Sequence, residues 1–510
     1  MERNKLSLEQ EYSLQLFESG QNILITGPAG TGKTCLIKQI MASSVLSRKK
    51  IQICAMTGCA AIILGCNATT LHSWSGIRLA KGTAQEIYDS IKINKKQTAK
   101  WRTTNILVVD EVSMMSKRLF DILNFIGKKI RGDPRPFGGI QLVFTGDFYQ
   151  LPPVAGPEVG SGLFCFESTD WVSTFLWENH VELKTVFRQK DPIYKEILNN
   201  IRVGRIDAGN IAVLNSCVNR PYDKAAHNGC VPTKLFAIHR KVEEINQQMF
   251  NAINEPCFEY SYVKKKDCVF YMESFKLIGQ DILGKCRREL TDAKSEFELD
   301  YMINNCPCER ILRLKKGANV MCTVNLDMDA GICNGSIGVI VDFMVMAGIS
   351  HPIVLFSNGV KRQMPLKYWQ SEEYPTLAIG QIPLRLAWAI TIHKIQGATL
   401  PMAEIDIGNT IFECGQSYVA LSRVQDLEGL YLSGFRPDKI KVHPTVLEFY
   451  KKIPQIEYEE EVEEEAEEKY NKSEKTSAPE KKELSFEEYA YNNDNDIDNG
   501  NEKDIKTIFL

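Results

Sequence analysis

The sequence of 510 residues has no run of about 20 consecutive apolar residues, the length that an α-helix needs to cross a bilayer. Its first residues lead into no apolar segment of the kind found in a secretory signal. We therefore expect a soluble, intracellular protein that does not bind membranes. Nothing in the sequence distinguishes the nucleus, the mitochondrion or a viral replication site as its location.

The sequence also lacks the cysteine spacing that metal sites use. It has 15 cysteines, but no Cys-x-x-Cys occurs, and Cys306 and Cys308 form the only close pair. A zinc or iron–sulfur site would need two such clusters. We therefore predict free thiols and a reducing compartment.

Charge is divided unevenly along the chain. The formal net charge is −3, but residues 455–510 hold 19 acidic and 7 basic side chains. The preceding residues carry 54 Lys and Arg against 45 Asp and Glu, a net charge of +9. A basic body is compatible with a polyanionic partner. The acidic segment, rich in Glu and then in Asn and Asp, is expected to be disordered.

Apolar runs recur in the first part of the chain with helical or loop sequence between them. Continuous runs of this kind predict strands that are buried on both faces of a parallel sheet. We expect strands at residues 22–26, 51–57, 106–110, 142–145 and 181–183. Between residues 250 and 385, short runs separated by Asn334-Gly335 and Asn358-Gly359 instead predict β-hairpins.

The most informative segment follows the first of these runs. Residues 27–34 read Gly-Pro-Ala-Gly-Thr-Gly-Lys-Thr and lead into a helical pattern. Strand, glycine-rich turn and helix in this order form a phosphate-binding loop, in which backbone N–H groups surround phosphate oxygens, Lys33 reaches the β- and γ-phosphates and Thr34 binds Mg²⁺. The predicted nucleotide-binding residues are Gly27, Pro28, Ala29, Gly30, Thr31, Gly32, Lys33 and Thr34.

Two later segments predict hydrolysis. The run 106–110 ends in Asp110 and Glu111, which suit a Mg²⁺ ligand and a general base for the attacking water. Gln150 follows another apolar run and precedes Pro152-Pro153, where a neutral side chain could sense the γ-phosphate. Arg188 and Arg423 are candidates for stabilising phosphoryl charge. From the residues alone, either arginine could equally be a surface ion-pair partner.

These segments together resemble the Pif1-type DNA helicases of superfamily one, the RecD-like branch, over about residues 6–435. The most discriminating stretch is Phe-Gly-Gly-Ile-Gln-Leu-Val at 137–143, joined to Gly-Asp-Phe-Tyr-Gln-Leu-Pro-Pro-Val at 146–154. The resemblance also includes 56–61, 70–74, 110–115, 187–189, 314–321, 389–400 and 418–423. Ile395 departs from the family, which usually has Ser there.

The resemblance implies a fold and an organisation. It implies an α/β protein with two RecA-like P-loop NTPase domains, a small wedge insertion, a mostly β, SH3-like insertion and a disordered acidic C-terminal tail. The expected domains are 1–175 with the wedge at about 76–100, then 176–249 with 385–450, the insertion 250–384 and the tail 455–510.

It also implies roles for single residues. Gln10 would read adenine, so that ATP with Mg²⁺ is the expected nucleotide, and Arg188 and Arg423 would sense phosphate. Single-stranded DNA needs cations and hydroxyls for its backbone and flat surfaces for its bases. The expected DNA contacts are Thr57, Thr70, His72, Ser73 and Trp74 in the first domain and Thr391, His393, Lys394, Gln396 and Thr399 in the second. Trp74 is equally compatible with core packing, and His393 with a structural role.

The expected function is therefore ATP-dependent unwinding of DNA, with movement 5′ to 3′ along single-stranded or forked DNA by a monomer, in replication, repair or recombination. A replication or repair protein could bind the acidic tail. The alternatives are a RecD-type enzyme and a DNA-stimulated ATPase that remodels or clamps nucleic acid without unwinding. A nucleoside kinase would leave the DNA-contact segments unexplained.

Overall fold

The computed structural model describes residues 6–455, except 47, 65, 67, 79, 224–229, 273–274, 307, 328–329, 347 and 372–373. The tail expected to be disordered lies outside the described residues from 456 onward. Within the described part, no helix is both long and apolar enough to cross a membrane. The cysteines whose side chains are described are free thiols, as predicted.

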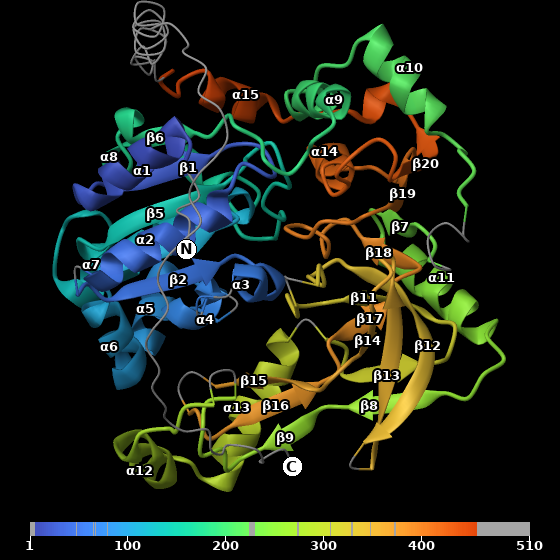
Figure 1. Ribbon diagram of the computed structural model, residues 1–510. Helices are drawn as coiled ribbons and strands as arrows, with labels where there is room; N and C mark the ends of the chain where they lie inside the picture. Colours follow the sequence, from blue (N-terminus) through green and yellow to red (C-terminus); the bar gives the residue numbers. More distant parts are fainter. Residues whose placement is uncertain are drawn as a thin grey trace, which may run out of the picture. The chain divides into compact units, whose positions relative to one another are not determined.

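The first lobe is built on a six-stranded parallel sheet in the order β3-β2-β4-β5-β1-β6 (Figure 1). The five predicted runs are all strands of this sheet. Its strands are β1 (Ile23–Thr26), β2 (Ile51–Ala55), β3 (Thr69–Thr70), β4 (Ile106–Asp110), β5 (Gln141–Gly146) and β6 (His180–Glu182).

Helices cover both faces of this sheet, which explains the continuous apolar runs. In β1, Ile23 and Ile25 join one buried cluster while Leu24 joins another. One face is covered by α1 (Leu8–Glu18), α2 (Lys33–Leu46) and α3 (Gly58–Leu64). The other is covered by α4 (Leu71–Ser75), α5 (Ala84–Ile93), α6 (Lys95–Thr103), α7 (Lys117–Arg131) and α8 (Trp171–Thr174).

The expected wedge insertion is a pair of helices, α5 and α6, that pack on α7. Ile87, Ile91 and Trp101 of this pair are buried in the same core as the sheet. The indole N–H of Trp101 donates a 3.0 Å hydrogen bond to the carbonyl of Ser75. The pair extends to Thr103 and is an integral part of the first lobe.

The second lobe has a four-stranded parallel sheet in the order β18-β7-β19-β20. Its strands are β7 (Thr233–Phe236), β18 (Ala389–Thr391), β19 (Ala403–Ile407) and β20 (Leu430–Phe435). Helix α11 (His239–Asn251) packs on one face. The other face is covered by α9 (Pro192–Arg202), α10 (Ala208–Ser216) and α14 (Gln416–Leu421).

Two domain boundaries differ from the expected ones. Strand β6, which was assigned to the second domain, pairs with β1 and completes the first sheet. Helix α15 (Pro444–Tyr450) was also assigned to the second domain, but Val446, Phe449 and Tyr450 are buried in the first lobe's core. Both segments are short, and nothing in their own sequence specifies which lobe they will join.

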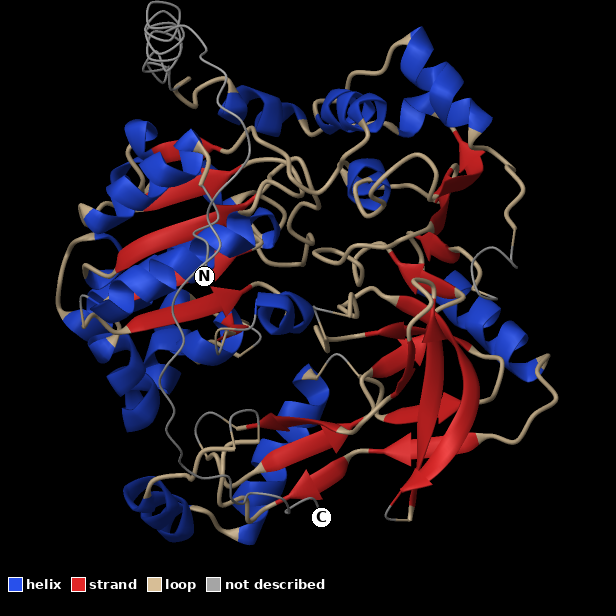
Figure 2. Cartoon of the chain, in the orientation of Figure 1, coloured by secondary structure: helices blue, strands red, loops and turns tan. Residues whose placement is uncertain are grey.

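The region 250–384 is mostly β, as Figure 2 shows. An antiparallel sheet has the order β14-β13-β12-β11-β17, and two smaller sheets have the orders β15-β16-β9 and β10-β8. The strands are β8 (Phe258–Ser261), β9 (Val263–Lys265), β10 (Ile311–Leu314), β11 (Asn319–Cys322), β12 (Ile337–Met346), β13 (Ile349–Phe356), β14 (Lys361–Gln363), β15 (Lys367–Gln370), β16 (Ala378–Gln381) and β17 (Leu384–Leu386). The Asn358-Gly359 turn joins β13 to β14, as predicted.

The same region contains two helices that the sequence pattern did not predict, α12 (Gln280–Glu289) and α13 (Asp292–Asn305). Thr291 caps α13 by accepting a hydrogen bond from the N–H of Lys294. Each helix buries few residues: α12 buries Cys286, and α13 buries Ser295, Leu299 and Ile303. Cys286, Leu299 and Ile303 share one small cluster, so the apolar stripe of each helix is narrow and gives a weak helix signal in the sequence. Short 3₁₀ helices lie at Val112–Met114, Pro136–Gly138, Cys165–Glu167, Trp177–Asn179 and Pro437–Lys439.

Candidate active site between the two lobes

The phosphate loop joins β1 to α2, as the sequence predicts. Its backbone has positive φ at Gly27 (141°), Gly30 (89°) and Gly32 (81°), a conformation that side chains disfavour. A Cβ at Gly27 would lie 2.4 Å from the carbonyl oxygen of Leu183. Helix α2 begins at Lys33, so its N-terminus and the loop N–H groups form a site for anions.

Lys33 and Gln10 both contact the loop itself. The Lys33 ammonium donates hydrogen bonds to the carbonyls of Gly27 (2.7 Å) and Pro28 (2.9 Å). Burial lowers the pKa of Lys33, although Asp147, Glu111 and Asp110 favour its charge. The Gln10 amide donates a 3.1 Å bond to the carbonyl of Thr31, so Gln10 supports the loop conformation.

The two carboxylates lie where β4 ends. Asp110 accepts hydrogen bonds from the Thr145 hydroxyl (2.5 Å) and the Glu111 N–H (2.9 Å). Glu111 has left-handed backbone angles, φ 58° and ψ 40°, that turn the chain away from the strand. Burial raises the pKa of both groups and, with the charge of Asp110, raises the pKa of Glu111 to about 7.

A side chain of the second lobe contacts Glu111. The Gln396 amide donates a 2.9 Å hydrogen bond to Glu111 Oε2 and a 3.4 Å bond to Gln150 Oε1. Gln150 and Gln396 are both buried. The structure therefore places Gln150 beside the carboxylates, as predicted, and places Gln396 in the same site rather than on a surface for DNA.

Two arginines complete the site. Arg423 is buried and bonds to its own lobe through the carbonyls of Val419 (2.8 Å) and Ala398 (3.3 Å). Burial and the nearby Arg188 lower the pKa of Arg423 to about 10. Arg188 Nη1 is buried and has no hydrogen-bond partner among the described residues.

Part of the phosphate loop, the two carboxylates, Gln150 and the two arginines line one cleft of about 390 Å³. Both lobes contribute to it: residues 29–35, Asp110, Glu111 and Gln150 from the first, and Arg188, Gly397 and Arg423 from the second or the segment leading to it. Three cationic side chains, a glycine-rich loop and two carboxylates suit a triphosphate with a divalent cation. Arg188 Nη1, which is buried without a hydrogen-bond partner among the described residues, indicates most clearly where an anion would bind.

Comparison with known proteins agrees with this geometry. A family model described as PIF1-like helicase matches residues 5–210, and one described as the 2B domain of DNA helicase Pif1 matches residues 299–343. The ATP-dependent DNA helicase RRM3 of Saccharomyces cerevisiae is 31% identical, over 88% of this chain and 68% of its own length. The chain belongs to the PIF1-like helicase family.

Other members of the family are similar to the chain to different extents. The ATP-dependent DNA helicase PIF1 of Danio rerio is 36% identical, and the match covers 88% of this chain but 64% of that protein. Uncharacterized protein 030L of Invertebrate iridescent virus 6 is 33% identical, over 88% of this chain and 94% of that protein. The chain thus spans less than two thirds of the Danio rerio helicase and nearly all of the viral protein.

Solved Pif1 structures have the same fold. The Candida albicans Pif1 crystal structure matches with a TM-score of 0.67 and 34% identity, covering 88% of this chain and all of that one. Bacteroides Pif1 in complex with ADP-AlF3 and single-stranded DNA matches with a TM-score of 0.56 and 26% identity, covering 88% of this chain and 97% of that one. A structure of two coordinating Pif1 helicases at forked duplex DNA matches with a TM-score of 0.57 and 27% identity, covering 88% of this chain and 97% of that one.

The predicted DNA contacts of the first lobe are only partly on its surface. The hydroxyls of Thr57 and Thr70 cap α3 and α4 by accepting bonds from the N–H groups of Ala60 (3.1 Å) and Ser73 (3.2 Å). His72 and Ser73 are half-buried. Trp74 is 2% exposed and packs on Trp101 with ring centroids 4.6 Å apart, so core packing is its role and the stacking prediction is wrong.

The predicted contacts of the second lobe lie in the turn after β18. His393 and Lys394 are exposed, Thr399 is half-buried and Thr391 is buried at the end of the strand. Thr399 lies against the Asn334-Gly335 turn of the β insertion, where a Cβ on Gly335 would be 2.2 Å from the Thr399 carbonyl oxygen. The insertion therefore contacts the segment that was predicted to bind DNA.

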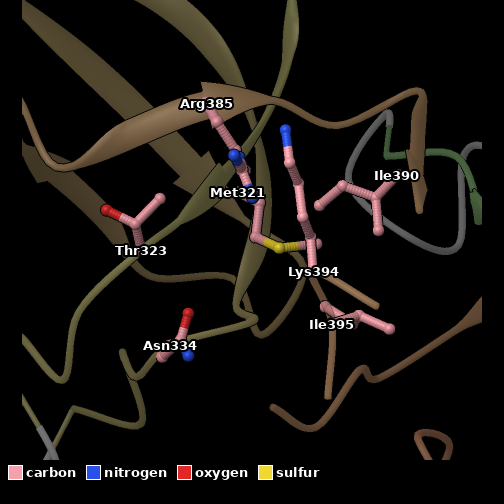
Figure 3. A pocket seen from close by; sticks show the side chains of 7 residues that line it. All are labelled: Met321, Thr323, Asn334, Arg385, Ile390, Lys394 and Ile395. Carbon is pink, nitrogen blue, oxygen red and sulfur yellow. The ribbon is translucent and has the colours of Figure 1, made fainter. Parts of the chain in front are cut away.

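A small pocket of about 20 Å³ lies at this junction (Figure 3). Lys394 and Arg385 both line it, from the turn after β18 and from β17. Two cations beside the polar side chains of Thr323 and Asn334 suit a phosphate group. Sequence reasoning missed Arg385, because a single arginine in a short strand gives no signal of its own.

Proposed function

We propose that this chain is a helicase that hydrolyses ATP to move 5′ to 3′ along single-stranded DNA and to separate the duplex ahead of it. The observation that carries the proposal is the single cleft to which both lobes contribute catalytic groups. A site divided in this way is complete only when the lobes close, so that hydrolysis and lobe movement are coupled. The named relatives, which are ATP-dependent DNA helicases, support the same activity.

On the nucleotide side, each group has a defined task. Lys33 exchanges its loop carbonyls for phosphate oxygens, and Glu111 accepts a proton from the attacking water. Arg423 and Arg188 stabilise the negative charge that develops on the phosphoryl oxygens. Mg²⁺, when bound, would be held by Thr34 and Asp110 and would neutralise phosphate charge.

On the DNA side, cations and hydroxyls of the second lobe and the insertion meet the strand. Lys394 and Arg385 suit the phosphates, and exposed His393 suits a base or a phosphate. Such contacts read the backbone, so affinity should depend strongly on salt and weakly on sequence. The direction of movement is proposed from family membership, and the Bacteroides and forked-DNA complexes support single-stranded and forked DNA as ligands.

A strand-separation assay tests this function. Purified protein receives duplexes that carry a 5′ tail, a 3′ tail or no tail, with ATP and Mg²⁺. We expect separation of the 5′-tailed duplex alone, and none for Lys33→Ala on any substrate. Separation from the 3′ tail would overturn the direction. DNA-stimulated ATP turnover without strand separation would instead support an ATPase that remodels or clamps nucleic acid.

Three further expectations belong to this proposal. We propose that the active protein is a monomer and that it works inside the cell. We also propose that residues 455–510 can bind a replication or repair protein. Light scattering of the protein on single-stranded DNA checks the monomer. A chain ending at Pro454 should unwind as the full chain does if the acidic segment serves partners rather than the motor.

A further inference from the structure

The turn after β18 presents two different faces. Lys394 is exposed, whereas Gln396, two residues later, is buried against Glu111 and Gln150. The turn is tight, because the N–H of Lys394 donates to the carbonyl of Thr391 (3.0 Å) and that of Ala398 to the carbonyl of Ile395 (3.0 Å). A movement of the exposed residues of this turn, such as Lys394, should therefore also move Gln396.

Glu111 is held from two directions. Its backbone N–H bonds to Asp110, which fixes the main chain of the first lobe. The hydrogen bond described for its carboxylate comes from Gln396, across the cleft. Gly397 has φ 85°, and a Cβ there would lie 4.0 Å from Glu111 Oε1 and 3.3 Å from Ile63, so the backbone of the turn also approaches closely.

The partners of Gln396 show that its amide has a specific orientation. Nε2 donates to both Glu111 and Gln150, while Oε1 is buried without a partner among the described residues. A buried amide oxygen without a partner costs free energy, because it has lost its hydrogen bonds to water. The donor is thus aimed at the carboxylate although its own acceptor stays unsatisfied, which is expected when the position serves the reaction rather than stability.

We propose that Gln396 is a positioning residue for hydrolysis: it orients the Glu111 carboxylate toward the attacking water and, through the turn that carries Lys394, makes this orientation depend on bound DNA. The inference rests on the proposed function and adds a specific link between the two sites. Gln150 receives the second bond from the same nitrogen, so one amide contacts both the proposed base and the proposed phosphate sensor.

The test replaces the amide with a thioether of similar length, Gln396→Met. With saturating single-stranded DNA, kcat should fall about tenfold or more, within the roughly 10²–10⁴-fold that a general base contributes. The KM for ATP and the Kd for a fluorescent oligonucleotide should change less than about twofold, because Gln396 is buried and is not among the residues that line the cleft. Gln396→Glu should be slower still, since it places a second carboxylate against Glu111.

A double-mutant cycle separates positioning from a structural effect. In a Glu111→Gln background, whose residual hydrolysis is measured in single turnovers, adding Gln396→Met should cause no further loss. The matched control is Gln247→Met, the same change at an exposed position of α11, which should leave kcat and the melting temperature unchanged.

Three results would overturn the inference. The first is an unchanged kcat of Gln396→Met, and the second is a loss of kcat in the Glu111→Gln background equal to the loss in the unmodified protein. The third is a raised Kd for DNA with a normal kcat at saturating DNA, which would return Gln396 to the role of a DNA contact. If DNA does not raise ATP turnover of the unmodified protein, the proposed function fails. The unstimulated kcat of Gln396→Met still tests the positioning role in that case.

Discussion

At the scale of single residues, burial determines the chemistry of Glu111. The side chain lies in the cleft beside Asp110, and together burial and this second carboxylate raise its pKa to about 7. A base must be unprotonated to accept the proton of water, so activity falls as the pH drops below the pKa. A carboxylate whose pKa lies near neutral pH is well matched to this task.

We therefore predict that kcat at saturating ATP and DNA rises between about pH 6 and pH 8 and reaches a plateau above it. Bound Mg²⁺ would lower the midpoint, so it should lie at or below 7. Glu111→Gln should retain nucleotide binding and lose turnover by roughly 10²-fold or more. A rate that is independent of pH over this range, or normal turnover by Glu111→Gln, would remove Glu111 as the base.

His180 gives a second prediction for a single residue, about stability. Its Nδ1–H donates to the carbonyl of Leu176 (2.8 Å), and its Nε2 accepts from the Trp171 indole (3.1 Å), so the buried ring is neutral. Burial lowers its pKa from 6.5 to about 4. The unfolded chain gains a proton below pH 6.5 that the folded protein does not, so stability is full above this pH and declines toward pH 4.

Between pH 6.5 and pH 4, the free energy of unfolding should fall by up to about 3 kcal/mol. Urea unfolding at a series of pH values measures it. His180→Gln should flatten the dependence, whereas His239→Gln, at an exposed position of α11, should leave it intact. An equal slope in the unmodified protein and His180→Gln would assign the decline to other groups.

The residues that sequence reasoning placed correctly share one property: they belong to continuous motifs. Lys33, Glu111 and Gln150 follow strands and Asp110 ends one, and the ends of parallel strands meet at one edge of the sheet. Gln396 was assigned to DNA through the family resemblance of residues 389–400. No pattern in the sequence shows that the turn places it on the opposite side, which only the tertiary packing decides.

At the scale of elements, the helices α5 and α6 show that an insertion can become part of a core. The sequence 76–100 is polar and rich in lysine, but Ile87 and Ile91, with Trp101, are buried in the core of the first lobe and pack on α7. Strands were predicted more reliably than helices in this chain, because burial on both faces leaves an unbroken apolar run. The helices α12 and α13 have no comparable pattern and were missed.

The packing of this pair leads to a prediction. Trp101 is fully buried, contacts Trp74 and donates to the Ser75 carbonyl. Trp101→Ala should therefore lower the free energy of unfolding by about 3–5 kcal/mol, as expected for a large buried side chain. Ile93→Ala at the exposed end of α5 is the control and should cost less than about 0.5 kcal/mol. Urea denaturation of both variants provides the comparison, and a small effect of Trp101→Ala would mean that the pair folds independently of the lobe.

At the scale of the whole molecule, a buried ion cluster joins the second lobe to the first. Arg202 ends α9 and contacts Asp147 (3.1 Å) and Glu182 (2.8 Å), which follow β5 and end β6. Its guanidinium carbon lies 4.6 Å from the ring centroid of Tyr149 and 5.2 Å from that of Tyr450. Sequence reasoning missed this cluster, since its members are far apart in the chain and follow no shared motif.

The cluster lies next to the segment that ends in Gln150. It therefore holds the lobes together beside the proposed nucleotide site, without closing the cleft itself. Arg202→Met should lower the free energy of unfolding by about 3–5 kcal/mol, because Asp147 would remain buried without its cation. Arg240→Met, on the exposed surface of α11, removes an exposed pair with Glu244 and should cost at most about 1 kcal/mol. Adding Asp147→Asn to Arg202→Met should restore part of the loss, since it removes the uncompensated charge. If Arg202→Met instead unfolds like the unmodified protein, the junction between the two lobes does not depend on this cluster.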